Sequence, residues 1–127
     1  MTNAIRLINF RNYVDSSFEF APKTVIIGQN GVGKSNIIEA LFLLSTGRSW
    51  RTNRENELIR FGAGFARILA DPIELAVIGG ERTKKNVKIH GKSARLLSLL
   101  GVSPSVLFTP NSLALVDGSP SMRRQFI

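Results

Sequence analysis

The sequence contains no cysteine and only one histidine among its 127 residues. The absence of thiols excludes disulfide bonds and thiolate metal sites. A single histidine argues against a histidine metal cluster and against Ser-His-Asp chemistry. No apolar run approaches the roughly 18 residues that a membrane span needs, and the polar start Met1-Thr2-Asn3 lacks the apolar core of a signal peptide. We therefore expect a cytoplasmic protein without a membrane partner.

Acidic residues are also scarce, with nine against 17 basic residues and a formal net charge of +8. Such an excess on a small body attracts polyanions, so nucleic acid is the leading candidate partner. Two alternatives stay open. Part of the positive charge could bind a triphosphate, or it could be neutralised by a part of the protein that this sequence does not contain. The length and the 43% hydrophobic residues suit one globular unit, and no linker divides residues 1–127.

The apolar pattern predicts an α/β protein. An alternating pattern indicates strands at 4–10 and 14–20, and the β-branched run at 24–27 indicates a strand buried on both faces. Helical spacing predicts a helix over 34–44 that ends at Gly47, followed by a short helix carrying Leu58, Ile59 and Phe61 on one side. The other expected elements are an antiparallel meander at 65–70, 73–78 and 86–90, helices at 94–100 and after Pro120, and a strand at 106–108.

The most specific motif lies between the expected buried strand and the helix. Its residues fit the phosphate-binding pattern G-x-x-x-x-G-K-[ST] in full: Gly28, Gln29, Asn30, Gly31, Val32, Gly33, Lys34 and Ser35. Strand, loop and helix follow in the order that the motif requires. The alternative, a glycine-rich turn without a ligand, fits this context poorly.

The residue types in the loop explain how it could hold ATP and Mg²⁺. Glycines permit positive φ and bring backbone amides against an anion without interference from Cβ. The helix N-terminus adds partial positive charge. We expect Lys34 to reach the β and γ phosphates, Ser35 to offer its hydroxyl to Mg²⁺, and Asn36 to contact the α phosphate.

The sequence contains no convincing residues for the hydrolysis of ATP. ATP hydrolysis also needs an acidic residue at the end of a second buried strand. Asp71 and Asp117 follow apolar runs, but each precedes Pro or Gly and is better explained as a turn residue. We therefore assign no catalytic residue and leave open whether the chain is an enzyme.

Several segments together resemble, in order, the N-terminal part of the RecF family of bacterial recombinational repair ATPases, whose heads are similar to those of ABC transporters and SMC proteins. The resemblance covers nearly the whole chain, and its combination of segments is more specific than the phosphate loop alone. The segments are 9–13, 28–36, 46–52, 57–60, 106–110 and 118–120 with Arg123 and Arg124.

The resemblance implies the N-terminal lobe of an ABC-type ATPase head, cut before the arm subdomain, the signature motif and the Walker B strand. It implies a role in repair of gaps and single-strand/double-strand junctions, in recombination, replication and the SOS response, with other recombination mediator proteins as partners. Family members are slow DNA-dependent ATPases that dimerise around ATP. Because this chain lacks the signature side, we expect weak nucleotide binding, no hydrolysis and no ATP-bridged homodimer.

Two positions depart from the family pattern. Asn111 and Ser112 stand where the family usually has two carboxylates, which puts metal or water contacts there in doubt. His90-Gly91 replaces a common Asn-Gly turn, a change that is tolerated because histidine is enriched at positive φ.

Basic residues outside the loop offer candidate contacts. Those after the helix surround Trp50, so they suit backbone contact and stacking, although Trp50 could instead pack in the core. Those of the hairpin could equally guard an edge strand. The DNA-contact candidates are Arg48, Arg51, Arg54, Lys84, Lys85 and Lys88. Arg11 and Asn12 resemble family positions near the nucleotide, or form a turn.

Two rival functions remain. A P-loop small-molecule kinase usually has its loop near the first strand, whereas here two expected strands precede it. A DNA-binding module with a vestigial loop would show DNA affinity that is indifferent to ATP and to Lys34.

Overall fold

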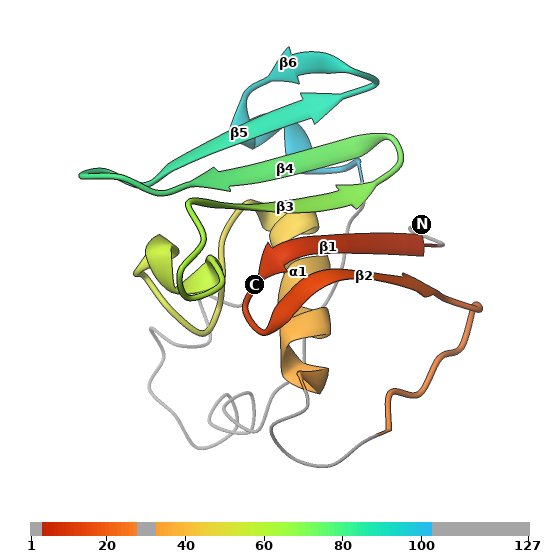
Figure 1. Ribbon diagram of the computed structural model, residues 1–127. Helices are drawn as coiled ribbons and strands as arrows, with labels where there is room; N and C mark the ends of the chain where they lie inside the picture. Colours follow the sequence, from red (N-terminus) through yellow and green to blue (C-terminus); the bar gives the residue numbers. More distant parts are fainter. Residues whose placement is uncertain (1–3, 28–32, 103–127) are drawn as a thin grey trace, which may run out of the picture.

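One antiparallel sheet dominates the computed structural model, which describes residues 4–27 and 33–102. Its six strands run in the order β2-β1-β3-β4-β5-β6. The strands are β1 (Ala4–Phe10), β2 (Tyr13–Glu19), β3 (Phe65–Ala70), β4 (Ile73–Ile78), β5 (Lys84–Ile89) and β6 (Lys92–Ala94). Figure 1 shows β3 beside β1, so the N-terminal hairpin and the meander form a continuous sheet.

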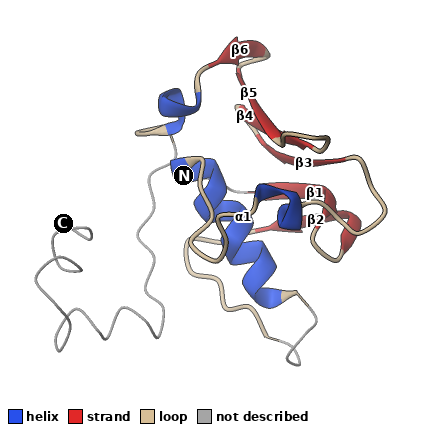
Figure 2. Ribbon diagram, turned by 90° about the vertical axis from the view of Figure 1, so that its left-hand side faces the viewer, coloured by secondary structure: helices blue, strands red, loops and turns tan. Residues whose placement is uncertain are grey.

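Helix α1 (Lys34–Thr46) covers one face of this sheet (Figures 1 and 2). Alternate residues of the central strands point toward it, and Leu7, Ile68 and Leu75 are completely buried. Ala40 and Leu43 bury the facing side of the helix. Burying such apolar surface is the main force that holds a helix against a sheet.

The two short 3₁₀ helices close the ends of this core. Helix η1 (Glu55–Leu58) buries Leu58, and Phe10 forms an isolated antiparallel bridge with Ile59. Helix η2 (Leu96–Leu99) buries Leu99 and contacts α1. The expected short helix after residue 54 is thus present as one 3₁₀ turn, but Phe61 does not share its buried side because Phe61 is fully exposed beyond it.

The hairpin strands, the meander and the helix with its Gly47 C-cap are confirmed. Gly47 takes φ 76°, and its amide donates to the carbonyl of Leu43. His90 and Gly91 both take positive φ in the β5–β6 turn, as the sequence indicated. Asp71 lies in the β3–β4 turn.

Two expected elements are wrong. Residues 24–27 form no strand, and Val25 and Ile27 are 82% and 88% exposed rather than buried. A β-branched run becomes a strand only where a neighbour pairs with its backbone, and none of the described strands does so. The helix at 94–100 is shorter than expected because Lys92–Ala94 pair with β5 as β6. The elements expected at 106–108 and after Pro120, with Asp117, Asn111 and Ser112, lie outside the described residues.

Candidate nucleotide-binding site

The described part of the phosphate loop is its end, Gly33-Lys34-Ser35, where helix α1 begins. Residues Gly28, Gln29, Asn30, Gly31 and Val32 lie outside the described residues. Gly33 is the N-cap, with φ 100°, and its carbonyl accepts from the amides of Asn36 and Ile37 at 3.1 and 3.2 Å. Among the residues that the structure describes, no side chain caps this helix N-terminus. The first-turn amides and the helix dipole therefore present partial positive charge toward the loop.

Gly33 packs directly against the turn that joins β1 and β2. A Cβ built at this position would lie 2.7 Å from both the Asn12 Oδ1 and the Tyr13 hydroxyl. That hydroxyl donates to the Gly33 carbonyl at 3.0 Å, and burial raises the pKa of Tyr13 above its usual range. The N-terminal hairpin thus fixes the conformation in which the loop enters the helix.

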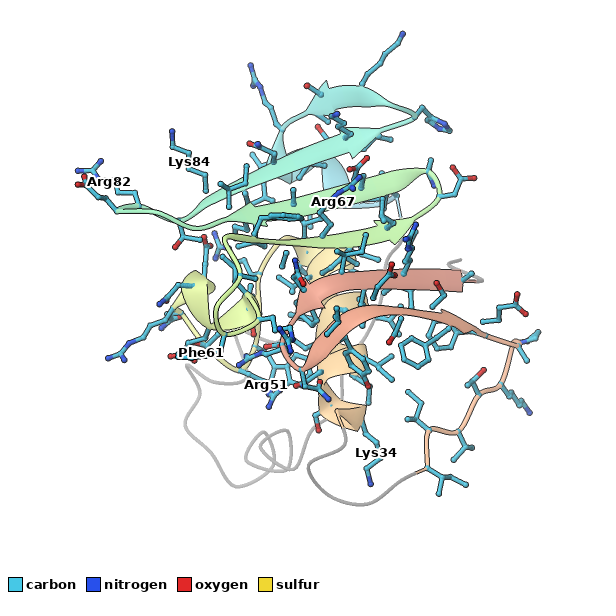
Figure 3. The ribbon with its side chains drawn as sticks, viewed as in Figure 1. Lys34, Arg51, Phe61, Arg67, Arg82 and Lys84 are labelled. Carbon is cyan, nitrogen blue, oxygen red and sulfur yellow. The ribbon has the colours of Figure 1, made fainter. Side chains whose placement is uncertain are left out.

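The side chains of the loop end differ in exposure. Lys34 is half-buried and Ser35 is exposed at the first turn of α1. Figure 3 shows the Lys34 side chain at the N-terminal end of α1, directed away from the sheet. An ammonium and a hydroxyl at this place are the donor set that Mg²⁺-bound triphosphate requires. The residues present therefore fit the cofactor.

Asn36 connects the site to two other segments. Its side-chain amide donates to the Asn12 Oδ1 at 2.8 Å, and its own Oδ1 accepts from Arg51 at 2.5 Å. The structure therefore brings Asn12, Asn36 and Arg51 together at the start of the helix. Asn36 is half-buried and already uses both ends of its amide, so a phosphate contact would have to compete with one of these partners.

One turn further along α1, the side chain of Glu39 is completely buried. Its carboxylate accepts hydrogen bonds from two guanidinium nitrogens of Arg11, Nε at 2.8 Å and a terminal nitrogen at 2.9 Å. Ser49 donates to it at 2.5 Å, and Arg51 lies 3.4 Å away. A buried carboxylate is stable only with such partners. Arg11, expected beside the nucleotide, is thus held by Glu39.

Glu39 could not be singled out from the sequence, because a lone glutamate in an amphipathic helix ordinarily faces solvent. The sequence hints at burial of Glu39 only through its apolar neighbours in the helix. Glu39 lies between the apolar positions Ile38 and Ala40, and two residues after Ile37, which is buried. Only the tertiary contacts show which cations neutralise it.

The basic DNA candidates divide into exposed and internally bonded residues. Arg48, Arg54, Lys84 and Lys88 are exposed. Lys85 is instead bonded within the protein, since its ammonium donates to the Gly47 carbonyl at 2.6 Å and pairs with Glu55 at 2.5 Å. It completes the C-terminus of α1, where a cation is favoured by the helix dipole. Arg51 is exposed but bonded to Asn36 and Glu39. For the other four exposed residues, contact with DNA stays a prediction.

Trp50 is half-buried and packs edge-to-face on Phe42, with ring centroids 5.7 Å apart. This contact matches the interpretation in which Trp50 packs in the protein.

A pocket of about 240 Å³ lies at the C-terminal end of α1, lined by residues that include Arg48, Ser49 and Lys85. It is smaller than the roughly 300 Å³ at which small-molecule sites begin.

None of the helices in residues 4–27 and 33–102 is long and apolar enough to cross a membrane. This finding is consistent with the sequence, in which long apolar runs are lacking.

Comparison with known proteins shows which families this chain resembles. The family model described as an AAA domain matches residues 4–108. The DNA replication and repair protein RecF of Halalkalibacterium halodurans is 42% identical over 97% of this chain, and RecF of Latilactobacillus sakei is 38% identical over the same share. The chain spans about 35% of the length of these relatives.

Solved structures show the same similarity. The recombination mediator protein RecF with ATP matches 99% of this chain and 37% of its own, with a TM-score of 0.83 and 28% identity. RecF with ATPrS gives a TM-score of 0.86 at the same identity, over 99% of this chain and 36% of that one. An SMC ATPase structure matches 98% of this chain and 96% of its own at a TM-score of 0.79 and 23% identity, which shows a shared fold. The predicted ABC-type head lobe is thereby confirmed.

Proposed function

Since the chain belongs to the AAA domain family and resembles RecF proteins over nearly its whole length, we propose that it provides the ATP-binding lobe of a RecF-type DNA repair ATPase. The observation that carries the proposal is the sequence Gly33-Lys34-Ser35 at the start of α1, in the backbone conformation that the β1–β2 turn fixes. ATP bound to RecF in a similar structure supports the choice of nucleotide.

In this proposal, the loop from Gly28 to Gly33 and the first-turn amides of α1 hold the phosphates. Lys34 neutralises the β and γ oxygens, and Ser35 binds Mg²⁺. Bound Mg²⁺ would screen the phosphate charge. Arg11 acts indirectly, because its guanidinium is held by Glu39 and its turn positions Asn12 against Gly33 and Asn36.

We place the DNA-repair role at gaps and single-strand/double-strand junctions, with DNA contacted by exposed basic residues. Hydrolysis, ATP-bridged dimerisation and contacts with other recombination mediators are assigned to the whole protein. For the 127 residues alone we propose weak ATP binding without turnover, because hydrolysis also needs an acidic residue at the end of a second buried strand. The two candidates, Asp71 and Asp117, are better explained as turn residues.

Calorimetry of Mg-ATP binding tests the proposal. Lys34→Ala should weaken binding about 10-fold or more, since it removes a full charge from the phosphates. Lys23→Ala is the matched control, because Lys23 is exposed and outside the motif, and it should bind like the unchanged chain. Circular dichroism verifies folding, and a phosphate-release assay measures turnover.

Absence of saturable binding in the folded chain would contradict the proposal for these residues. Equal binding by Lys34→Ala and the unchanged chain would mean that the loop is not the site. Transfer of phosphate to a small acceptor would favour the kinase alternative. DNA affinity indifferent to both ATP and Lys34 would favour a DNA-binding module with a vestigial loop.

A further inference from the structure

Three apolar side chains are exposed at one end of the sheet. Phe61 is 99% exposed, and Phe65 and Ile78 are also exposed. Phe65 and Ile78 are register partners across β3 and β4, and Ile78 is also the partner of Lys84 in β5. Cross-strand partners share one face of a sheet. Phe65, Ile78 and Lys84 therefore lie on the same face. It is the face away from α1, because Ala66 and Val77, their neighbours in sequence, are buried in the core.

The backbone around Phe61 is held at several points. The Ala63 amide donates to the Arg60 carbonyl at 2.9 Å, and Gly62 between them takes φ 86°. This combination is typical of a type II turn with Phe61 at its second position. The Arg60 amide donates to Asn9 at the end of β1. The turn is therefore attached to the sheet, and Phe61 projects from a fixed base.

A hydrogen bond joins this turn region to the β4–β5 hairpin. The Gly79 amide donates to the Gly64 carbonyl at 2.9 Å, which sets the end of β4 beside the residues that follow Phe61. Figure 3 shows Phe61, Arg82 and Lys84 on one side of the molecule. Among the described residues, Arg60, Arg82 and Lys84 are exposed and form no side-chain hydrogen bond or ion pair with the protein. Glu81 is the acidic residue of the hairpin turn.

We propose that this surface, formed by Phe61, Phe65 and Ile78 with Arg60, Arg82 and Lys84, binds single-stranded nucleic acid, with one base stacked on Phe61. The proposal rests on the DNA-binding role proposed above and adds a site and a strand preference to it. An aromatic ring stacks on any base, and neighbouring cations pair with the phosphates on either side. In a duplex the bases stack on each other, so their faces are hidden from Phe61. The three cations outnumber the exposed acidic residues of the flanking segments, Glu57 in η1 and Glu81 in the hairpin turn, which favours a polyanion over an apolar protein partner.

The experiment measures fluorescence anisotropy of a labelled single-stranded oligonucleotide, and of a duplex of the same length, with the unchanged chain. Phe61→Ala should weaken single-strand binding about 5- to 150-fold, the range that corresponds to the loss of one stacked base. Phe61→Trp should keep the affinity of the unchanged chain. Phe61→Leu should lose affinity as Phe61→Ala does, because leucine is apolar but has no aromatic face. Leu97→Ala is the control, because Leu97 in η2 is another exposed apolar residue, at 76%, and this variant should bind like the unchanged chain.

Each result decides a separate point. Failure of the unchanged chain to bind either oligonucleotide would overturn the proposed DNA-binding role itself. Binding that Phe61→Ala leaves unchanged would overturn only the stacking site. Full retention of affinity by Phe61→Leu would show apolar docking without stacking, and equal losses for single strand and duplex would remove the strand preference. Either of these would overturn the inference as stated.

Discussion

Gly33 is required for two separate reasons at the residue scale. Its φ of 100° is accessible to glycine and strained for other residues. The side of Gly33 that would carry a Cβ faces the Asn12 and Tyr13 side chains. The glycine of the phosphate loop therefore serves packing against the β1–β2 turn as well as access to an anion.

Gly33→Ala should lower the free energy of unfolding by about 2–4 kcal/mol, because positive φ and an overlap add together. Gly91→Ala separates the two effects, since Gly91 has φ 76° but open space around it. That control should lose only about 1–2 kcal/mol. Urea denaturation of both variants measures the difference, and equal losses would show that the Asn12 and Tyr13 contacts contribute nothing.

At the element scale, α1 is joined to two segments through one buried carboxylate. Glu39 receives Arg11 from the β1–β2 turn and Ser49 and Arg51 from the segment after the helix. Arg51 in turn contacts Asn36. This network holds the hairpin and the post-helix segment against the first turns of α1, where the nucleotide site begins.

Glu39→Gln should cost about 3 kcal/mol of unfolding free energy, because it leaves the Arg11 guanidinium without its counter-charge in a largely buried place. Glu74→Gln is the matched control. Glu74 pairs with Arg67 across β3 and β4, but both side chains are partly exposed, so the loss should stay below about 1 kcal/mol. Thermal or urea unfolding compares them, and a Glu39→Gln variant as stable as the control would refute the importance of the network.

At the scale of the whole molecule, the net charge of +8 is what remains after nine carboxylates are counted against 17 cations, so ion pairs within the protein do not reduce it. Arg6, Arg11, Arg51, Arg67 and Lys85 form ion pairs with carboxylates. The exposed candidates Arg48, Arg54, Lys84 and Lys88 do not appear in these pairs. These exposed cations attract a polyanion electrostatically, and the nucleic-acid partner inferred from composition stays a prediction.

If six or more of the exposed cations meet phosphates, DNA affinity should fall by roughly 10³-fold or more between about 50 and 200 mM salt. Lys84→Ala and Lys88→Ala should each reduce the slope of log affinity against log salt by about one. Lys85→Met should leave the slope unchanged, because its ammonium is paired with Glu55. A slope near zero for the unchanged chain would contradict electrostatic DNA binding.

Local sequence patterns determined much of the fold. Alternation placed β1 to β4, helical spacing and Gly47 placed α1, and the motif around Gly33 located the proposed nucleotide site. These signals succeed because they depend on neighbours a few residues apart, such as the two-residue period of strands and the positive φ of a C-cap glycine.

Only the tertiary structure decided which groups meet across the chain. The pairing of β1 with β3, the burial of Glu39 against Arg11, the bond between Lys85 and Gly47 and the exposure of Phe61 all depend on distant segments. Residues 24–27 show the limit most clearly: their composition indicated a buried strand, but a strand needs a hydrogen-bonded neighbour. Composition describes a segment's preference, whereas pairing and burial depend on what the rest of the fold places beside it.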